Sequence, residues 1–435
     1  MNEFLSKKLY LLLQSVRREP VAQVLAELER TQYLGAAELR QLQAEYLARI
    51  LGWASKTCKA YQKYQGAPLA DWPLLTKSRL STDRNSYLSD NYAGPAVDWS
   101  TSGSTGNPVV VRRSFNSIAY HHASLFRAHR WYGIDVGQRE ARLWGVPHTT
   151  SGRLRERLKD FTMNRIRASA YELNEECLEK FWIRVVSWKP AYLFGYSSLL
   201  DKFAEYVISK GRRGEDLKLK AVVCTSETLM ESYRENIQRA FSCPVVSEYG
   251  STETGIIAYE CPNGGMHIPC EAVNVELLPS DIEGLQSVVL TDLHNAAMPL
   301  IRYQIGDLAA CDDSLCKCGR FLPKLKNITG RESSIIETPD GRKIHTILFY
   351  YSLCDLNGGG IKEFQVVRTK DFEYVFNLVP GPGFRLEKLE FVKKVLAKKL
   401  GSEVNVICRV VTSIPRTAAG KFRDFVDQRK PDTSI

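Results

Sequence analysis

The stretch LEKFWIRVVSWKPAYLFGYSSLLDKFAEYVISKG, residues 178–211, passes from apolar residues at helical spacing to a short apolar run and then to a second helical pattern. The alternation continues in LKAVVCTSE (219–227), LMESYRENIQRAF (229–241) and CPVVSEYG (243–250). Helices that alternate with short apolar strands are typical of a parallel sheet covered by helices on its faces. These residues therefore predict an α/β fold.

The segments on either side of this stretch have different patterns. About the first ninety residues carry apolar side chains at helical spacing, and we expect these helices to cover a core built by later residues. Between Gly265 and Leu308 the apolar runs become shorter and lose their helices, which predicts an antiparallel or barrel-like appendage. We expect all these segments to form one large N-terminal domain made of several subdomains.

A domain boundary is expected in KNITGRESS, residues 326–334, where turn-forming residues follow the appendage. Beyond it, FQVVRT and EYVFNLV are typical of strands, and LEKLEFVKKVLAKKLG predicts a helix that ends at Gly401. We therefore expect an N-terminal domain of residues 1–329 and a small, mobile α+β C-terminal domain of residues 330–435.

The composition limits the classes of function. The chain has 59 Lys and Arg against 49 Asp and Glu, and its net charge of +10 suits an anionic substrate such as a nucleotide or a carboxylate. Because acids interrupt the densest basic cluster, residues 210–220, we expect no nucleic-acid partner. No apolar run suits a membrane span or a signal peptide, so we expect a cytoplasmic protein. The eleven cysteines favour reduced thiols or metal ligands over a disulfide framework.

The loop WSTSGSTGNP, residues 99–108, contains far more hydroxyl and glycine residues than a turn requires. It is not a Walker A loop, because no Lys-Ser or Lys-Thr pair follows the glycines. By itself it is consistent with a flexible surface turn. The β-branched run VVVRR, residues 109–113, predicts a strand directly after it, and a loop anchored in this way can present N–H groups and hydroxyls to a phosphate.

Three later stretches resolve the role of this loop: SEYGSTETG (247–255), IRYQIGDLA (301–309) and IPRTAAGKFRDFV (414–426). In this order, the four stretches resemble the signatures of the adenylate-forming superfamily, which includes acyl-CoA synthetases, nonribosomal peptide adenylation domains and luciferases. The pieces YECPNGGMHI, AMPLIRYQIGDL and CKCGR resemble the phenylacetate-CoA ligase and CapK-like branch most closely. The resemblance covers most of the chain from about residue 100 to residue 426.

The resemblance implies an enzyme that activates a carboxylic acid with ATP and Mg²⁺, forms an acyl-adenylate and releases pyrophosphate. The acyl group then passes to a thiol, with coenzyme A as the leading acceptor and an aryl or other compact acid as the leading substrate. One alternative is transfer to a carrier-protein phosphopantetheine or to an amine. A remote alternative is a non-catalytic module that binds nucleotide or, stabilised by zinc, nucleic acid. The oligomeric state stays open between monomer and homodimer.

The resemblance also implies a role for individual residues in nucleotide binding. The phosphate-binding loop would consist of Ser100, Thr101, Ser102, Gly103, Ser104, Thr105 and Gly106. Tyr249 would pack against the adenine, and the nucleotide site would further include Ser226, Glu227, Gly250 and Ser251. Asp307 would accept hydrogen bonds from the ribose hydroxyls, and Arg331 would reach the ribose or the α-phosphate. Without the family, Asp307 would be taken for a turn cap.

Four residues are implied in the chemical step. Thr252 would lie at the α-phosphate, and Glu253 would hold the Mg²⁺ ion, which prefers oxygen ligands. Lys421 would contact the substrate carboxylate and the α-phosphate as a point charge where two anions meet. Arg302 would lie near the phosphates, or would be a structural ion-pair partner. Relatives usually carry Asp at the position of Ser333, so the pivot of the C-terminal domain is expected to differ in its hydrogen bonding.

Cysteine and histidine gather between residues 261 and 318. Cys261, His267, Cys316 and Cys318 would supply a closed, four-ligand set of the kind that holds structural zinc, with Cys311 as a replacement ligand. The alternative is a group of small buried thiols. His121 lies with a second histidine in a predicted helix, where it either lines the acyl pocket or packs as part of a helix face.

Overall fold

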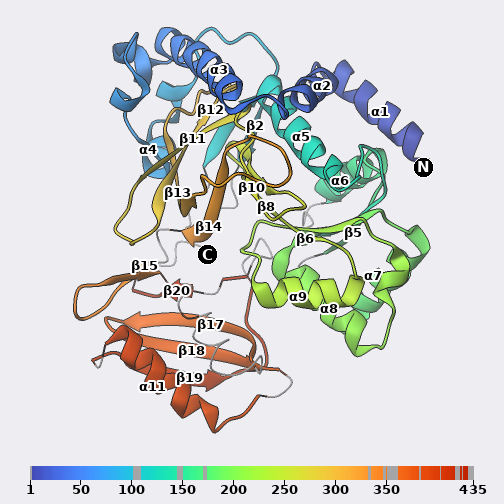
Figure 1. The fold of residues 1–435 in the computed structure, drawn as a ribbon, viewed down its shortest axis with the longest axis vertical. Helices are drawn as coiled ribbons and strands as arrows, with labels where there is room; N and C mark the ends of the chain where they lie inside the picture. Colours follow the sequence, from blue (N-terminus) through green and yellow to red (C-terminus); the bar gives the residue numbers. More distant parts are fainter. Residues whose placement is uncertain are drawn as a thin grey trace.

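The computed structural model describes most of the chain, and Figure 1 shows how its elements are arranged. The described residues are 2–100, 109–144, 150–169, 174–331, 335–345, 349, 361–381, 384–401, 403–416, 422–423 and 425–429.

The predicted N-terminal helices are present, and they cover part of the core. They are α1 (Glu3–Val16), α2 (Val21–Thr31), α3 (Ala36–Thr57) and α4 (Lys77–Thr82), with the 3-10 helices η1 (Lys59–Tyr64), η2 (Leu69–Asp71) and η3 (Arg84–Tyr87). Val21, Val24 and Leu28 lie on one face of α2 and share a buried cluster with Ala119 and Ala123 of α5 (Phe115–Arg130). Among the described helices, none is long and apolar enough to cross a membrane.

The stretch that predicts the α/β fold forms a parallel sheet with helices between its strands. The elements are β4 (Glu140–Trp144), α6 (Thr150–Thr162), β5 (Arg165–Ser169), α7 (Glu175–Trp188), β6 (Tyr192–Tyr196), α8 (Ser197–Ser209), η4 (Gly214–Leu217), β7 (Ala221–Thr225), α9 (Glu231–Phe241) and β8 (Val245–Ser251). The strands lie in the order β5-β4-β6-β7-β8, and all neighbouring pairs are parallel. Every residue of β6 and β7 is buried, as expected where helices cover both faces of a sheet.

The segment predicted as an antiparallel or barrel-like appendage continues the same sheet. Its strands are β9 (Gly255–Glu260), β10 (Met266–His267), β11 (Val273–Pro279), β12 (Gln286–Asp292), β13 (Tyr303–Cys311) and β14 (Lys324–Arg331), and β1 (Leu75–Thr76) pairs with β13. The antiparallel pairing is confirmed. Among the described strands the order β11-β12-β13-β14-β10-β9-β8 is an open path, so the pairing does not close into a barrel.

The C-terminal residues form a separate α+β unit with its own core. Its elements are β15 (Ile335–Glu337), β16 (Lys343–His345), β17 (Ile361–Lys370), β18 (Glu373–Pro380), α11 (Lys388–Leu400), β19 (Asn405–Val410) and β20 (Phe425–Asp427). The helix ends before Gly401, which has the positive φ of 113° that favours glycine. Figure 1 shows this unit against the N-terminal domain, below α8, α9 and β14. β14 itself runs to Arg331, two residues beyond the boundary expected at 329/330.

Candidate active site and metal centre

Several predicted nucleotide residues lie at the carboxyl ends of the neighbouring parallel strands β7 and β8, the edge at which open α/β sheets bind ligands. Ser226 directly follows β7, and Tyr249, Gly250 and Ser251 end β8. Ser100 is the last residue of β2 (Ala96–Ser100), and the strand predicted after the loop is β3 (Val110–Ser114), paired with β2. The predicted residues that lie outside the described ranges are Thr101, Ser102, Gly103, Ser104, Thr105, Gly106, Ser333 and Lys421.

Tyr249 and Asp307, which are 58 positions apart, meet directly. The Tyr249 hydroxyl donates a hydrogen bond to Asp307 Oδ2 at 2.8 Å. Asp307 lies on β13, where its Cα is paired in register with that of Arg331 on β14. The structure therefore brings together, from three strands, the positions predicted for adenine packing and ribose recognition.

The turn that carries Thr252 and Glu253 joins β8 to β9, and buried groups hold it. The fully buried Arg113 donates from Nη2 to the carbonyl oxygen of Thr254 at 3.1 Å. Tyr303 donates its hydroxyl to Glu253 Oε1 at 2.9 Å, and Glu253 is 8% exposed, whereas Thr252 is exposed. The carboxylate of Glu253 is thus fixed in place, and its oxygen atoms fit the donor type that Mg²⁺ prefers.

The guanidinium of Arg302 contacts other groups of the N-terminal domain. It donates from Nη1 to the carbonyl oxygens of Ala70 and Trp72 at 2.8 and 2.9 Å, and its Nε lies 3.1 Å from Glu276 Oε1. Arg302 is 9% exposed and has a φ of 51°. Arg302 was considered either as a residue near the phosphates or as a structural ion-pair partner. Its contact with Glu276 is of the second kind.

His121 packs against the strand that follows the Glu253 turn. Its Nδ1 accepts a hydrogen bond from the backbone N–H of Ile256 at 3.2 Å. Burial, together with the charges of His122 and Arg113, lowers the pKa of His121 well below its usual range, so the ring is neutral and can accept. A Cβ at Gly255, where φ is +91°, would lie 2.6 Å from this nitrogen. The contact therefore depends on glycine at position 255, and His121 lies on a packed helix face.

Glu227 lies where the two domains touch. Its Oε1 accepts a hydrogen bond from the backbone N–H of Phe422 at 2.9 Å. Its Oε2 accepts hydrogen bonds from Ser198, from the backbone N–H at 3.0 Å and from the hydroxyl at 2.6 Å. The described contacts of this carboxylate are to protein donors, so its predicted contact with nucleotide stays a prediction.

Cys261, His267, Cys316 and Cys318 meet as the spacing predicted, with their ligand atoms all within 4.8 Å of one another. Cys261 Sγ lies 3.5 Å from Cys316 Sγ, and Cys318 Sγ lies 3.2 Å from His267 Nε2. Tetrahedral zinc, with Zn–S near 2.3 Å and Zn–N near 2.0 Å, requires separations of about 3.8 Å between two sulfurs and about 3.5 Å between sulfur and nitrogen. The four atoms are therefore close to the arrangement that a zinc ion requires.

The surroundings of this cluster also suit a metal. His267 Nδ1 lies 3.0 Å from the carbonyl oxygen of Leu322, a contact that leaves Nε2 directed at the cluster. Burial lowers the pKa of His267 to about 4, so the imidazole is neutral, the form that binds metals. Cys311, considered as a replacement ligand, is exposed, points its Sγ at Asp313 at 3.0 Å and is not a member of the cluster.

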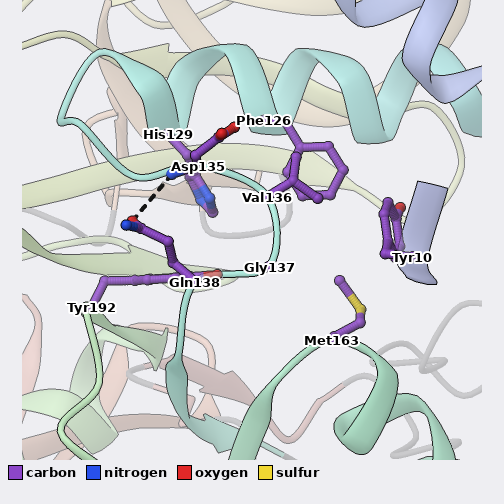
Figure 2. A pocket seen from close by; sticks show the side chains of 9 residues that line it. All are labelled: Tyr10, Phe126, His129, Asp135, Val136, Gly137, Gln138, Met163 and Tyr192. Carbon is purple, nitrogen blue, oxygen red and sulfur yellow. Dashed lines mark hydrogen bonds between the residues drawn. The ribbon is translucent and has the colours of Figure 1, made fainter. Parts of the chain in front are cut away.

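A small cavity lies away from these sites, at the amino end of β6 (Figure 2). It holds about 20 Å³, which is room for one water molecule. Its lining residues are Tyr10, Phe126, His129, Asp135, Val136, Gly137, Gln138, Met163 and Tyr192. It is too small for a nucleotide and lies at the edge of the sheet opposite to the predicted site.

Known proteins resemble this chain over most of its length. The family model described as "CapK C-terminal domain" matches residues 336–428. Protein CapK of Staphylococcus aureus is 22% identical over 379 residues, which cover 85% of this chain and 82% of CapK. Phenylacetate-coenzyme A ligase of Thermus thermophilus is 23% identical over 444 residues, which cover 90% of this chain and 97% of the ligase.

The crystal structure of 2-hydroxyisobutyryl-CoA ligase in the postadenylation state matches with a TM-score of 0.72 at 18% identity, and covers 92% of both chains. These similarities support the adenylate-forming superfamily for this chain. Within the superfamily they point to the branch of CapK and the phenylacetate-CoA ligases.

The two domains of this chain are arranged more like those of the ligase in one of its solved conformations than in another. The same ligase in its thioesterification state matches with a TM-score of only 0.56, although the coverage of this chain is again 92%. Because the sequence and the coverage barely change between the two comparisons, the difference in score reflects the arrangement of the parts.

Several site residues carry no local sequence signal. Arg113 lies in a β-branched run that marks it only as part of a strand, and Tyr303 lies in a stretch whose resemblance points to Asp307 instead. Ser198 lies at the start of a helix and looks like an ordinary first-turn serine. Arg113 contacts Thr254 across 141 positions, Tyr303 contacts Glu253 across 50 and Ser198 contacts Arg416 across 218, so only the fold identifies these pairs.

Proposed function

We propose that this protein is an AMP-forming ligase, which activates a carboxylic acid with ATP and transfers the acyl group to coenzyme A. One observation carries the proposal: the hydrogen bond between Tyr249 and Asp307 joins two superfamily stretches beside the turn that carries Glu253. The names of the relatives support coenzyme A as the acceptor and a compact acid, aryl or similar, as the substrate.

The residues would divide the work of the adenylation step. The oxygen of a carboxylate must attack the α-phosphate while pyrophosphate leaves, so two anions have to be brought together. Asp307 and Tyr249 would orient the nucleoside, Thr252 and the loop of residues 100–106 would bind phosphate oxygens, and Lys421 would neutralise charge where the anions meet. Glu253 would hold Mg²⁺, which supplies charge neutralisation at the phosphates.

We further propose that Cys261, His267, Cys316 and Cys318 hold a structural zinc ion. All four positions of a tetrahedral ion would be filled by protein atoms, which leaves none open for substrate. The ion would tie the end of β9 and strand β10 to the connection between β13 and β14. Its role would therefore be to stabilise this part of the sheet.

The proposed ligase activity is tested by ATP–pyrophosphate exchange over a panel of carboxylic acids, followed by thioester formation with coenzyme A. Exchange that depends on one class of acid supports the proposal. Exchange without transfer to coenzyme A would favour a carrier-protein thiol or an amine as acceptor. ATP binding without exchange for any acid would mean a non-catalytic nucleotide-binding module.

A further inference from the structure

A polar cluster fixes the C-terminal domain to the N-terminal domain on both sides of residues 417–421, which include Lys421. Glu227, just after β7, accepts from the backbone N–H of Phe422 at 2.9 Å. Ser198, in the first turn of α8, accepts from Arg416 Nη1 at 2.8 Å. Arg416 and Phe422 are the described residues on either side of this segment, and each contacts the N-terminal domain.

The two N-terminal anchors are also bonded to each other. The Ser198 hydroxyl donates to Glu227 Oε2 at 2.6 Å, and the Ser198 backbone N–H donates to the same oxygen at 3.0 Å. The Ser198 hydroxyl therefore links a carboxylate on one side to a guanidinium on the other. The side chains of Glu227 and Arg416 are only 11% and 14% exposed, so water competes little for these contacts.

A second contact extends the cluster along α8. Lys202, one helical turn after Ser198, lies 2.8 Å from Glu363 on β17, and Arg416 Nη2 lies 3.6 Å from the same carboxylate. Lys202, Glu363 and Arg416 are charged, so these contacts between the two domains are ion pairs. Such contacts can be replaced by water when the domains move apart.

We infer that Glu227, Ser198 and Arg416 form an interdomain latch, which holds the C-terminal domain in the orientation used for adenylation. This inference rests on the proposed ligase function. This protein, in which the latch contacts are formed, matches the postadenylation structure of 2-hydroxyisobutyryl-CoA ligase better than the thioesterification structure. That difference agrees with the inference. Ser198 and Arg416 are then positioning residues, which act by holding the described part of the C-terminal domain at Arg416 and Phe422.

The latch predicts that its loss affects the two half-reactions differently. In Ser198→Ala, Arg416 loses its acceptor and Glu227 loses a donor, whereas the backbone of α8 is unchanged. Adenylation should become about tenfold slower, the effect expected for one charge-assisted hydrogen bond. Thioester formation from supplied acyl-adenylate should stay within about twofold. Arg416→Gln should behave in the same way, and the double variant should be little worse than either single variant, because both break one connection.

The matched control is Ser209→Ala at the other end of α8, where the hydroxyl donates only within its own helix, to the carbonyl oxygen of Tyr206 at 2.9 Å. Hydrogen exchange of the full-length protein gives a readout that needs no activity. The amide of Phe422 should exchange faster in Ser198→Ala and Arg416→Gln than in the control, because its acceptor is no longer held.

The two kinds of measurement separate the latch from the ligase proposal. Faster exchange at Phe422 in a protein that adenylates no acid would support the domain contact and refute the ligase function. Unchanged exchange at Phe422, or equal loss of both half-reactions in the two latch variants, would overturn the latch even if the protein is a ligase.

Discussion

Replacing Cys316 by serine should remove the metal ion and lower the melting temperature of this protein. Cys316 Sγ lies 3.5 Å from Cys261 Sγ, and the four ligand atoms span at most 4.8 Å, so they are nearly in place before a metal binds. A bound ion stabilises a fold by RT ln(1 + [L]/Kd), which is about 4 kcal/mol when free zinc is 1,000 times Kd. For a domain of about 330 residues, whose entropy of unfolding is roughly 0.7 kcal/mol/K, about 4 kcal/mol corresponds to a shift of roughly 6 °C in melting temperature.

The assay combines elemental analysis with thermal unfolding, each with and without a strong chelator. The parent protein should contain close to one zinc per chain, and chelator should lower its melting temperature by about the same amount as Cys316→Ser. The variant itself should no longer respond to chelator. Cys311→Ser is the matched control, since this thiol lies five positions away, is exposed and is not a member of the cluster.

A parent protein without metal, and with the same melting temperature as Cys316→Ser, would refute the zinc proposal. The four residues would then be a group of partly buried thiols beside a neutral histidine. Equal zinc content in the parent and in Cys316→Ser would show that the ion, if present, is held elsewhere.

Three further changes test the proposed active site. Glu253→Gln should slow adenylation by at least about a hundredfold at saturating Mg²⁺ with the fold intact, because an amide is a poor ligand for a hard cation. The control is Glu283→Gln at an exposed position, and a loss of only a few-fold in Glu253→Gln would contradict the role of Glu253. Tyr249→Phe keeps the ring but removes the donor to Asp307, so KM for ATP should rise about tenfold with a smaller change in kcat, and an unchanged KM would contradict the role of this pair. Lys421→Ala should slow adenylation by about a hundredfold and leave thioester formation from supplied acyl-adenylate nearly unchanged, as single-turnover kinetics of each half-reaction would show; equal losses in both would mean that the lysine stays at one site throughout.

The sequence alone determined the elements and their class. The alternation between residues 178 and 250 predicted helices and parallel strands that the structure contains, because helical and strand periodicities are properties of neighbouring residues. The resemblance of short stretches placed Tyr249 and Asp307 in one site, and the structure joins them by a hydrogen bond. The spacing of Cys261, His267, Cys316 and Cys318 also predicted a cluster that is present, although it lies in irregular connections and short strands.

Only the tertiary structure decided which strands pair and which side chains contact each other. The described antiparallel strands extend the parallel sheet, and their pairing does not close into a separate barrel, since pairing depends on which edges meet in space. Arg302 lies beside a superfamily signature, yet its guanidinium is held by Ala70 and Trp72, more than 200 positions earlier in the chain. Glu227 contacts Phe422, which lies 195 positions later in the chain, and no local sequence pattern predicts such a pair. Contacts of this kind arise because burial leaves each polar group only the partners that the fold places nearby.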